Sequence, residues 1–181
     1  MPGSATWNPS SGARRTDTAT VVLTIAENGI LAGILGAGVV ALWFLLLDMI
    51  TRGMPFYTPS LLGSIIFAGK DASAVTDLNG AAVFAYTGLH GILFLGAGTT
   101  LAWMFSQFER NPQVGMILLL LFVTFEAILW GVGVSIIPAL AGAVGAWAIM
   151  IANVGSALAM FSFLLRRHPS AMESLRNALK E

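Results

Sequence analysis

Four apolar runs constrain the fold more than any other feature of the sequence. They cover residues 29–50, 83–105, 114–137 and 139–165. A helix needs about 20 mainly apolar residues to cross the hydrocarbon core of a bilayer, and each run is long enough. Because unpaired backbone groups are costly in lipid, such runs are expected to be helical. The sequence therefore predicts an all-α integral membrane protein, with a four-helix bundle within residues 21–169.

The composition agrees with a membrane protein and excludes several other classes. Of 181 residues, 56% are hydrophobic and only 10% are charged, whereas soluble domains are about 25% charged. Nine Lys and Arg balance nine Asp and Glu, so no basic excess is present to bind nucleic acid. The absence of cysteine excludes thiolate zinc sites and disulfides. The membrane is the expected partner, together with larger membrane-protein subunits.

The two ends of the chain differ from its middle. Residues 1–20 are rich in Gly, Pro, Ser and Thr, which predicts a flexible tail. A cleaved signal peptide is the alternative, but the run that begins at Gly29 is too long and lacks a cleavage motif. In residues 170–181, Ser170 and Glu173 have capping-box spacing, which predicts a short amphipathic helix.

Basic residues predict the orientation in the membrane. With four spans, the chain ends and the connection between the second and third spans share one side. That side has seven basic residues and the other has two, Arg52 and Lys70. Basic residues are enriched on the cytoplasmic side. We therefore expect a multi-pass protein of a bacterial inner membrane with both termini in the cytoplasm. Pro138 directly follows the third run, which predicts a tight hairpin to the fourth.

The connection between the first two runs carries a short apolar piece, residues 61–67, that cannot cross a bilayer. Phe56 and Tyr57 precede it, and aromatic rings favour the headgroup region. We expect this segment to lie at the membrane surface. A re-entrant loop is the alternative, although it would need shielding by protein.

Small residues at intervals of three and four predict where the helices pack. Close backbone approach drives helix association in lipid. The second run offers Gly88, Gly91 and Ala97. The first run offers Gly29, Gly33, Gly36 and Ala37, and the last offers Ala141, Gly145, Ala148, Ala152, Ser156 and Ala159. The third run is bulky on all sides, so much of it is expected to face lipid or another protein.

Three polar residues lie deep in the apolar runs and are candidate site residues: His90, Glu126 and Asn153. Ionisable groups in a bilayer are costly and are often functional. Their depths allow one buried cluster, which would serve as a proton or ion site. Alternatively, hydrogen bonds of Glu126 with Asn153 or Thr124 would only specify helix packing. In a third possibility, Glu126 or His90 faces a neighbouring subunit.

Other polar residues suggest narrower roles. Asp48 and Arg52 are one helical turn apart and predict an interfacial ion pair. Arg166, Arg167 and His168 follow the last run and predict an anchor or a contact with lipid headgroups. His90 is also a candidate pigment or haem ligand, since Gly88 and Gly91 would leave room for a flat ring. Bound lipid is the other cofactor considered. No metal-binding cluster is expected.

Four strings carry a resemblance to a known group of proteins. They are GILAGILGAGVVALWFLLLD, PFYTPSLLG, YTGLHG and AWAIMIANVGSALAMFSFLLRRHP. Over residues 28–169 the sequence resembles small four-span bacterial inner-membrane proteins of unassigned chemistry. The resemblance implies architecture and supplies no catalytic residues.

The expected function follows from what the chain offers and lacks. No spacing such as G-x-S-x-G or H-E-x-x-H is present, so we do not expect an enzyme. We expect a non-catalytic accessory subunit of a larger electron-transfer complex of respiration or photosynthesis. The alternatives are a small proton- or ion-coupled carrier that uses Glu126, and a pigment- or haem-binding subunit that uses His90.

Overall fold

The computed structural model describes residues 10–136, 144–170 and 173. Within them the secondary structure is entirely helical, which confirms the all-α prediction. The elements are α1 (Ser10–Arg52), α2 (Tyr57–Ala68), the short 3-10 helix η1 (Ala72–Ala74), α3 (Gly80–Arg110), α4 (Pro112–Ile136) and α6 (Ala146–Arg167). In the part of the chain that the structure describes, three stretches are long and apolar enough to cross a membrane: Thr18–Arg52, Gly80–Arg110 and Ala146–Arg167.

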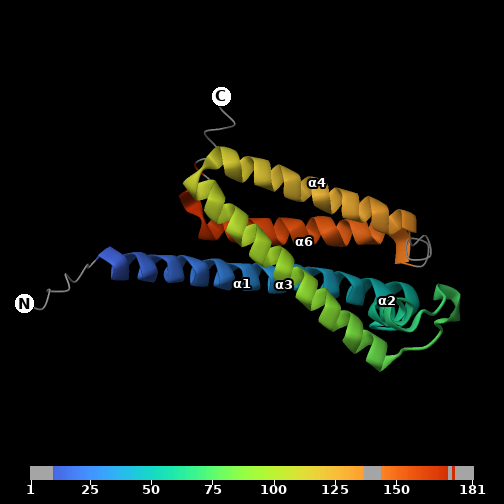
Figure 1. The fold of residues 1–181 in the computed structure, drawn as a ribbon. Helices are drawn as coiled ribbons and strands as arrows, with labels where there is room; N and C mark the ends of the chain where they lie inside the picture. The colour runs from blue at the N-terminus through green and yellow to red at the C-terminus, as the bar shows by residue number, and fades with distance from the viewer. Residues whose placement is uncertain (1–9, 137–143, 171–172, 174–181) are drawn as a thin grey trace, which may run out of the picture.

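Four long helices are present among the described residues, and the described contacts of α4 are fewer than those that join α1 to α3 and α6. α1 packs extensively against α3 and α6, whereas α4 packs mainly against α3. Figure 1 shows α4 turning back from the end of α3 and running alongside α6, on the side away from α1. The described part of the molecule is therefore a core of α1, α3 and α6 with α4 attached. The hairpin expected at Pro138 lies outside the described residues.

The first helix begins earlier than the sequence predicted. α1 starts at Ser10, so residues 10–20 are helical where a flexible tail was expected. Extending an existing helix adds one hydrogen bond for each residue fixed, whereas starting a new helix is costly. The packed apolar part of α1 therefore supports polar turns before it. Residues 1–9 and most of the predicted amphipathic helix at residues 170–181 lie outside the described residues.

Glycines bring the backbones of α1 and α3 together where the two helices cross (Figure 1). A Cβ added at Gly98 of α3 would collide with the backbone of Gly29 and Gly33 in α1. Gly29 and Gly33 were predicted to lie at a helix contact, and they do so, opposite Gly98 of α3. A Cβ at Gly88 or Gly91 would meet no described atom within 4 Å, so the prediction that these two glycines form the groove is wrong.

α6 packs on α1 along one stripe of its surface. Every fourth residue is buried, which places the buried side chains on one face: Ala148, Ala152, Ser156, Met160 and Leu164. The indole of Trp43 in α1 donates a hydrogen bond to the carbonyl of Ala148 at 3.0 Å. Trp43 and Trp147 also make an edge-to-face contact at 6.3 Å between ring centroids. The small residues predicted for this run thus include three that form the interface.

Asp48 holds the short helix α2 against the end of α1. Its carboxylate, in a residue only 1% exposed, accepts hydrogen bonds from the backbone N–H and the hydroxyl of Thr58, both at 2.7 Å. Thr58 lies in the first turn of α2, where backbone N–H groups lack helical partners. Asp48 therefore caps a helix that it does not belong to. Figure 1 shows α2 almost end-on, so it runs across α1 at the place expected for a surface-lying segment.

Candidate functional site

A buried polar cluster joins α1, α3 and α6 at the end of the bundle farthest from α2. His168 follows the last turn of α6 and is buried, as is Asn28 of α1. Nδ1 of His168 lies 3.1 Å from Oε1 of Glu109 in α3, and Nε2 lies 3.5 Å from the amide nitrogen of Asn28. The hydroxyl of Ser170 donates to the same Glu109 oxygen at 2.6 Å. We call these four residues the His168 cluster.

The surrounding helices determine the position of the imidazole. His168 lies four residues beyond Leu164, so it continues the buried stripe of α6. Asn28 lies one turn before Ala32 on the buried face of α1. This geometry suits a ring that donates from Nδ1 to the Glu109 carboxylate and accepts at Nε2 from the Asn28 amide. Each ring nitrogen then has a partner from a different helix, which fixes the relative positions of all three helices.

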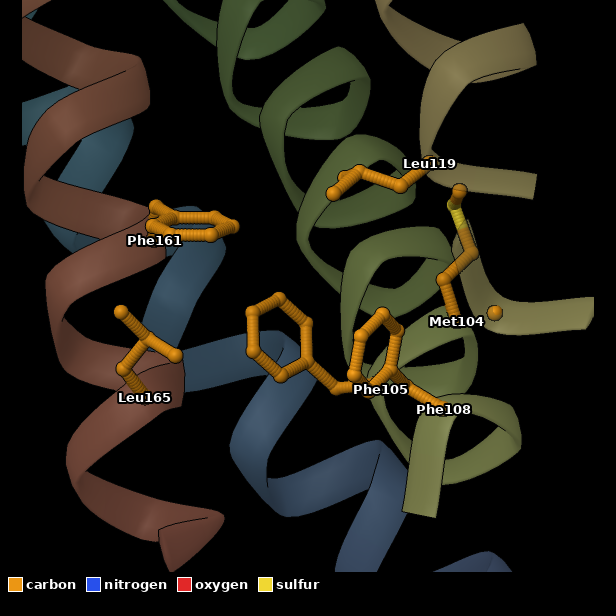
Figure 2. A pocket seen from close by; sticks show the side chains of 7 residues that line it. Met104, Phe105, Phe108, Leu119, Phe161 and Leu165 are labelled. Atoms are coloured by element: carbon orange, nitrogen blue, oxygen red, sulfur yellow. The ribbon is translucent and has the colours of Figure 1, made fainter. Parts of the chain in front are cut away.

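An apolar pocket adjoins the cluster. Phe105 links the two, because its ring lies 5.9 Å from the His168 ring and also lines the pocket. Figure 2 shows Phe161 and Leu165 of α6 on one side of Phe105, and Leu119 of α4 on the other. The cavity itself is small, about 20 Å³, and opens to the surroundings. Its lining is wholly apolar, so its open side suits contact with a hydrocarbon chain such as that of a lipid.

Breaking the cluster at Glu109 is expected to destabilise the helix core. Glu109→Ala removes the contacts to His168 and Ser170 and leaves the buried imidazole without its acceptor. Because the Glu109 side chain is 30% exposed, we expect a loss of about 1 kcal/mol in the free energy of unfolding. Denaturant titration in detergent measures it. Glu27→Ala removes an exposed carboxylate near the same end and is the control; equal losses in both variants would contradict a role for the cluster.

His90 lies in the groove between α1 and α3, away from the His168 cluster. Its ring stacks on Tyr86 at 5.9 Å and contacts Phe94 at 4.5 Å between centroids. Its Nε2 is buried and has no hydrogen-bond partner among the described residues. A pigment or haem ligated here would require the ring to turn outward, because protein atoms cover the ligating nitrogen.

The structure tests only one of the other two predicted cluster residues. Asn153 is exposed on α6, so it does not belong to a buried cluster. Depth along a helix was used to predict convergence, but depth does not determine the direction in which a side chain points. Glu126 lies within α4, and its side chain is outside the described part of the molecule. The proton or ion site therefore stays a prediction.

The remaining predicted residues lie near the two ends of the bundle. Arg52 lies over the ring of Tyr57, with 4.2 Å between the guanidinium carbon and the ring centroid. Both members of the predicted pair, Asp48 and Arg52, thus contact the start of α2. Arg166 and Arg167 are exposed, and Arg167 lies 5.5 Å from the ring centroid of Phe163. In the described ranges no group of three or more His, Asp or Glu residues is placed to hold a metal ion.

Sequence reasoning did not predict that Asn28, Glu109 and His168 come together. His168 was grouped with the arginines before it as part of an anchor. The available signal was the spacing of four that connects His168 to Ser156, Met160 and Leu164.

Comparison with known proteins found no matching family model, no matching curated protein and no matching solved structure.

Proposed function

We propose that this chain is a non-catalytic accessory subunit of a larger membrane assembly, and that α4 is the helix that docks on a larger subunit. The observation that carries the proposal is the sparse packing of the described part of α4 on the other described helices. Among the described elements, α4 makes substantial contact only with α3. By contrast, α1 contacts α3 and α6 along much of its length.

One side of the described part of α4 packs on the rest of the chain, and the other side exposes apolar side chains that a partner could cover. Leu119 and Phe122 pack on the apolar core, and Gly115 lies directly against Phe108 of α3. Other apolar side chains in the same part of α4 are exposed: Val114, Ile117, Leu120, Leu121 and Val123. An apolar face of this kind suits lipid or another membrane protein. We favour a protein because the described side chains of α4 pack mainly on α3 and leave most of the apolar surface uncovered.

The arrangement also supports a four-span topology with cytoplasmic termini. α4 has 25 residues and would be about 37 Å long, sufficient to cross a bilayer. The contact of His168 with Glu109 places the ends of α6 and α3 side by side. Arg110, Arg166 and Arg167 are therefore together at one end of the core, which suits the cytoplasmic face of a bacterial inner membrane.

A respiratory or photosynthetic electron-transfer complex is the assembly that we propose first. Small helical subunits of this design would fill gaps between larger subunits and retain lipid between them. The apolar pocket beside Phe105 suits that second role, since its lining matches an acyl chain. In this proposal the chain catalyses no reaction itself.

Photocrosslinking from α4 tests the proposal. A photoreactive residue is placed at Leu120, which is 67% exposed, and in a matched variant at Leu158 of α6, which is 62% exposed. In native membranes we expect Leu120 to crosslink to one defined larger protein, and Leu158 to crosslink mainly to lipid. Crosslinks to lipid alone from both positions would contradict docking through α4.

A further inference from the structure

A polar pocket of about 370 Å³ lies at the end of the molecule where α2, η1 and the start of α3 meet. This end is opposite the His168 cluster. Its polar lining includes Ser64, Lys70, Thr76, Asp77 and Asn79, together with Gly80 at the start of α3. The pocket is distinct from the apolar pocket beside Phe105 and plays no part in the proposed docking through α4.

Ser64 provides the first indication that the pocket receives a polar ligand. The residue is only 1% exposed, and its hydroxyl has no hydrogen-bond partner among the described residues. A buried hydroxyl without a partner costs free energy, and such groups in native proteins usually have an explanation. A polar group held in the pocket that Ser64 lines would supply the missing partner.

One part of the lining suits an anionic oxygen. Lys70 contributes an ammonium group, and α3 begins at Gly80 with its N-terminus toward the pocket. The N–H groups in the first turn of a helix have no helical acceptors and lie at the positive end of the helix dipole. The Asn79 side chain caps the N–H of Ala82 at 3.2 Å. The N–H of Gly80, at the first helical position, is left for a ligand.

Another part of the lining suits a cation. The carboxylate of Asp77 lies in the same pocket and accepts a hydrogen bond from the Thr76 hydroxyl at 3.2 Å. A simple anion would be attracted by Lys70 and repelled by Asp77. A ligand with both a phosphate and an ammonium group would satisfy both charges.

The position of the pocket indicates where such a ligand comes from. α1 ends at Arg52 and α3 begins at Gly80, and both contain candidate membrane spans. The pocket therefore lies at the end of the apolar spans, at the level of lipid headgroups. Ile66 and Phe67 at the end of α2 are exposed beside it. We propose that this pocket binds the phosphate and ammonium groups of an ethanolamine phospholipid headgroup.

Lipid competition on the full-length protein tests the assignment. The chain is purified in mixed micelles with equal amounts of phosphatidylethanolamine, phosphatidylglycerol and phosphatidylcholine, and native mass spectrometry counts the retained lipids. The ethanolamine lipid should be retained about threefold to fivefold over either competitor, as expected for partly exposed charge pairs. Phosphatidylglycerol lacks the cation, and the quaternary group of phosphatidylcholine cannot donate a hydrogen bond to Asp77.

Variants assign the preference to this pocket. Lys70→Gln and Asp77→Asn should each reduce the preference to near onefold, whereas Asp71→Asn, a nearby carboxylate outside the lining, should retain it. All three side chains are exposed, so unchanged thermal unfolding is expected to show that each variant is folded. Equal retention of the three lipids, or a preference that survives both pocket variants, would overturn the assignment. Equally tight binding of free phosphoethanolamine would replace the lipid by a soluble zwitterion.

Discussion

Gly98→Val is expected to destabilise the protein by about 3 kcal/mol, because overpacking of a close-packed contact costs about 1 to 3 kcal/mol and here the obstacle is rigid. Any Cβ at this position would collide with the backbone of Gly29 and Gly33 in α1. A flexible side chain can move aside, but a helix backbone cannot do so without separating the two helices. The contact between α1 and α3 is the most extensive in the described structure.

The matched control for this variant is two residues away on the same helix. A Cβ at Gly96 would meet no described atom within 4 Å, so Gly96→Val should change the free energy of unfolding by less than about 0.5 kcal/mol. Denaturant titration in one detergent compares the two variants. Similar stabilities for Gly98→Val and Gly96→Val would contradict the observed crossing of α1 and α3.

Asp48→Ala is expected to release α2 from the rest of the molecule. The change removes the carboxylate that accepts from Thr58 and leaves a buried N–H and a buried hydroxyl without these acceptors. Hydrogen bonds to a charged group contribute about 1.5 to 3 kcal/mol each, and the two here end on the two oxygens of one carboxylate, so we expect a loss of about 3 kcal/mol. Hydrogen exchange should rise across Tyr57–Ala68 more than in α1 or α6.

Two further variants show whether the effect comes from capping. Asp48→Asn keeps a side-chain oxygen that can accept from the Thr58 N–H, so we expect it to cost about 1 kcal/mol. Asp71→Ala removes an exposed carboxylate in the segment after α2 and should leave exchange in α2 unchanged. If Asp48→Ala leaves α2 as well protected as in the parent protein, the carboxylate does not hold this helix.

The long helices were predictable because their signal is local. A run of about 20 apolar residues predicts a membrane helix wherever it occurs, and α1, α3 and α6 contain such runs. The beginning of α1 was not predictable in this way. Residues 10–20 have a composition typical of a tail, but they are helical because packing of the following residues stabilises the helix that they extend.

Packing partners were only partly predictable, because spacing defines a face of a helix without showing which face meets a neighbour. In α1 the glycines at intervals of three and four do form the contact. In α3 the glycine at the contact is Gly98, whereas Gly88 and Gly91 have open space around them. The crossing point depends on how two helices meet along their whole length, which no single segment encodes.

The polar contacts were the least predictable part of the candidate site. Asn28 and His168 are 140 residues apart in sequence, so their contact exists only after three helices have assembled. The pairing of Asp48 with Thr58 similarly depends on the chain reversal before α2, where Phe56 adopts a left-handed conformation with φ 66°. The spacing of residues along one helix identifies only neighbours on that helix. It therefore pointed from Asp48 to Arg52 and could not indicate Thr58 on α2.

Extraction of this protein from its native membrane in a mild detergent tests the proposed function most directly. All co-purifying chains are identified, and the visible spectrum of the same fraction is recorded. We expect a larger membrane protein in fixed stoichiometry with this chain, joined through α4. A colourless particle that contains only this chain would contradict the accessory-subunit account.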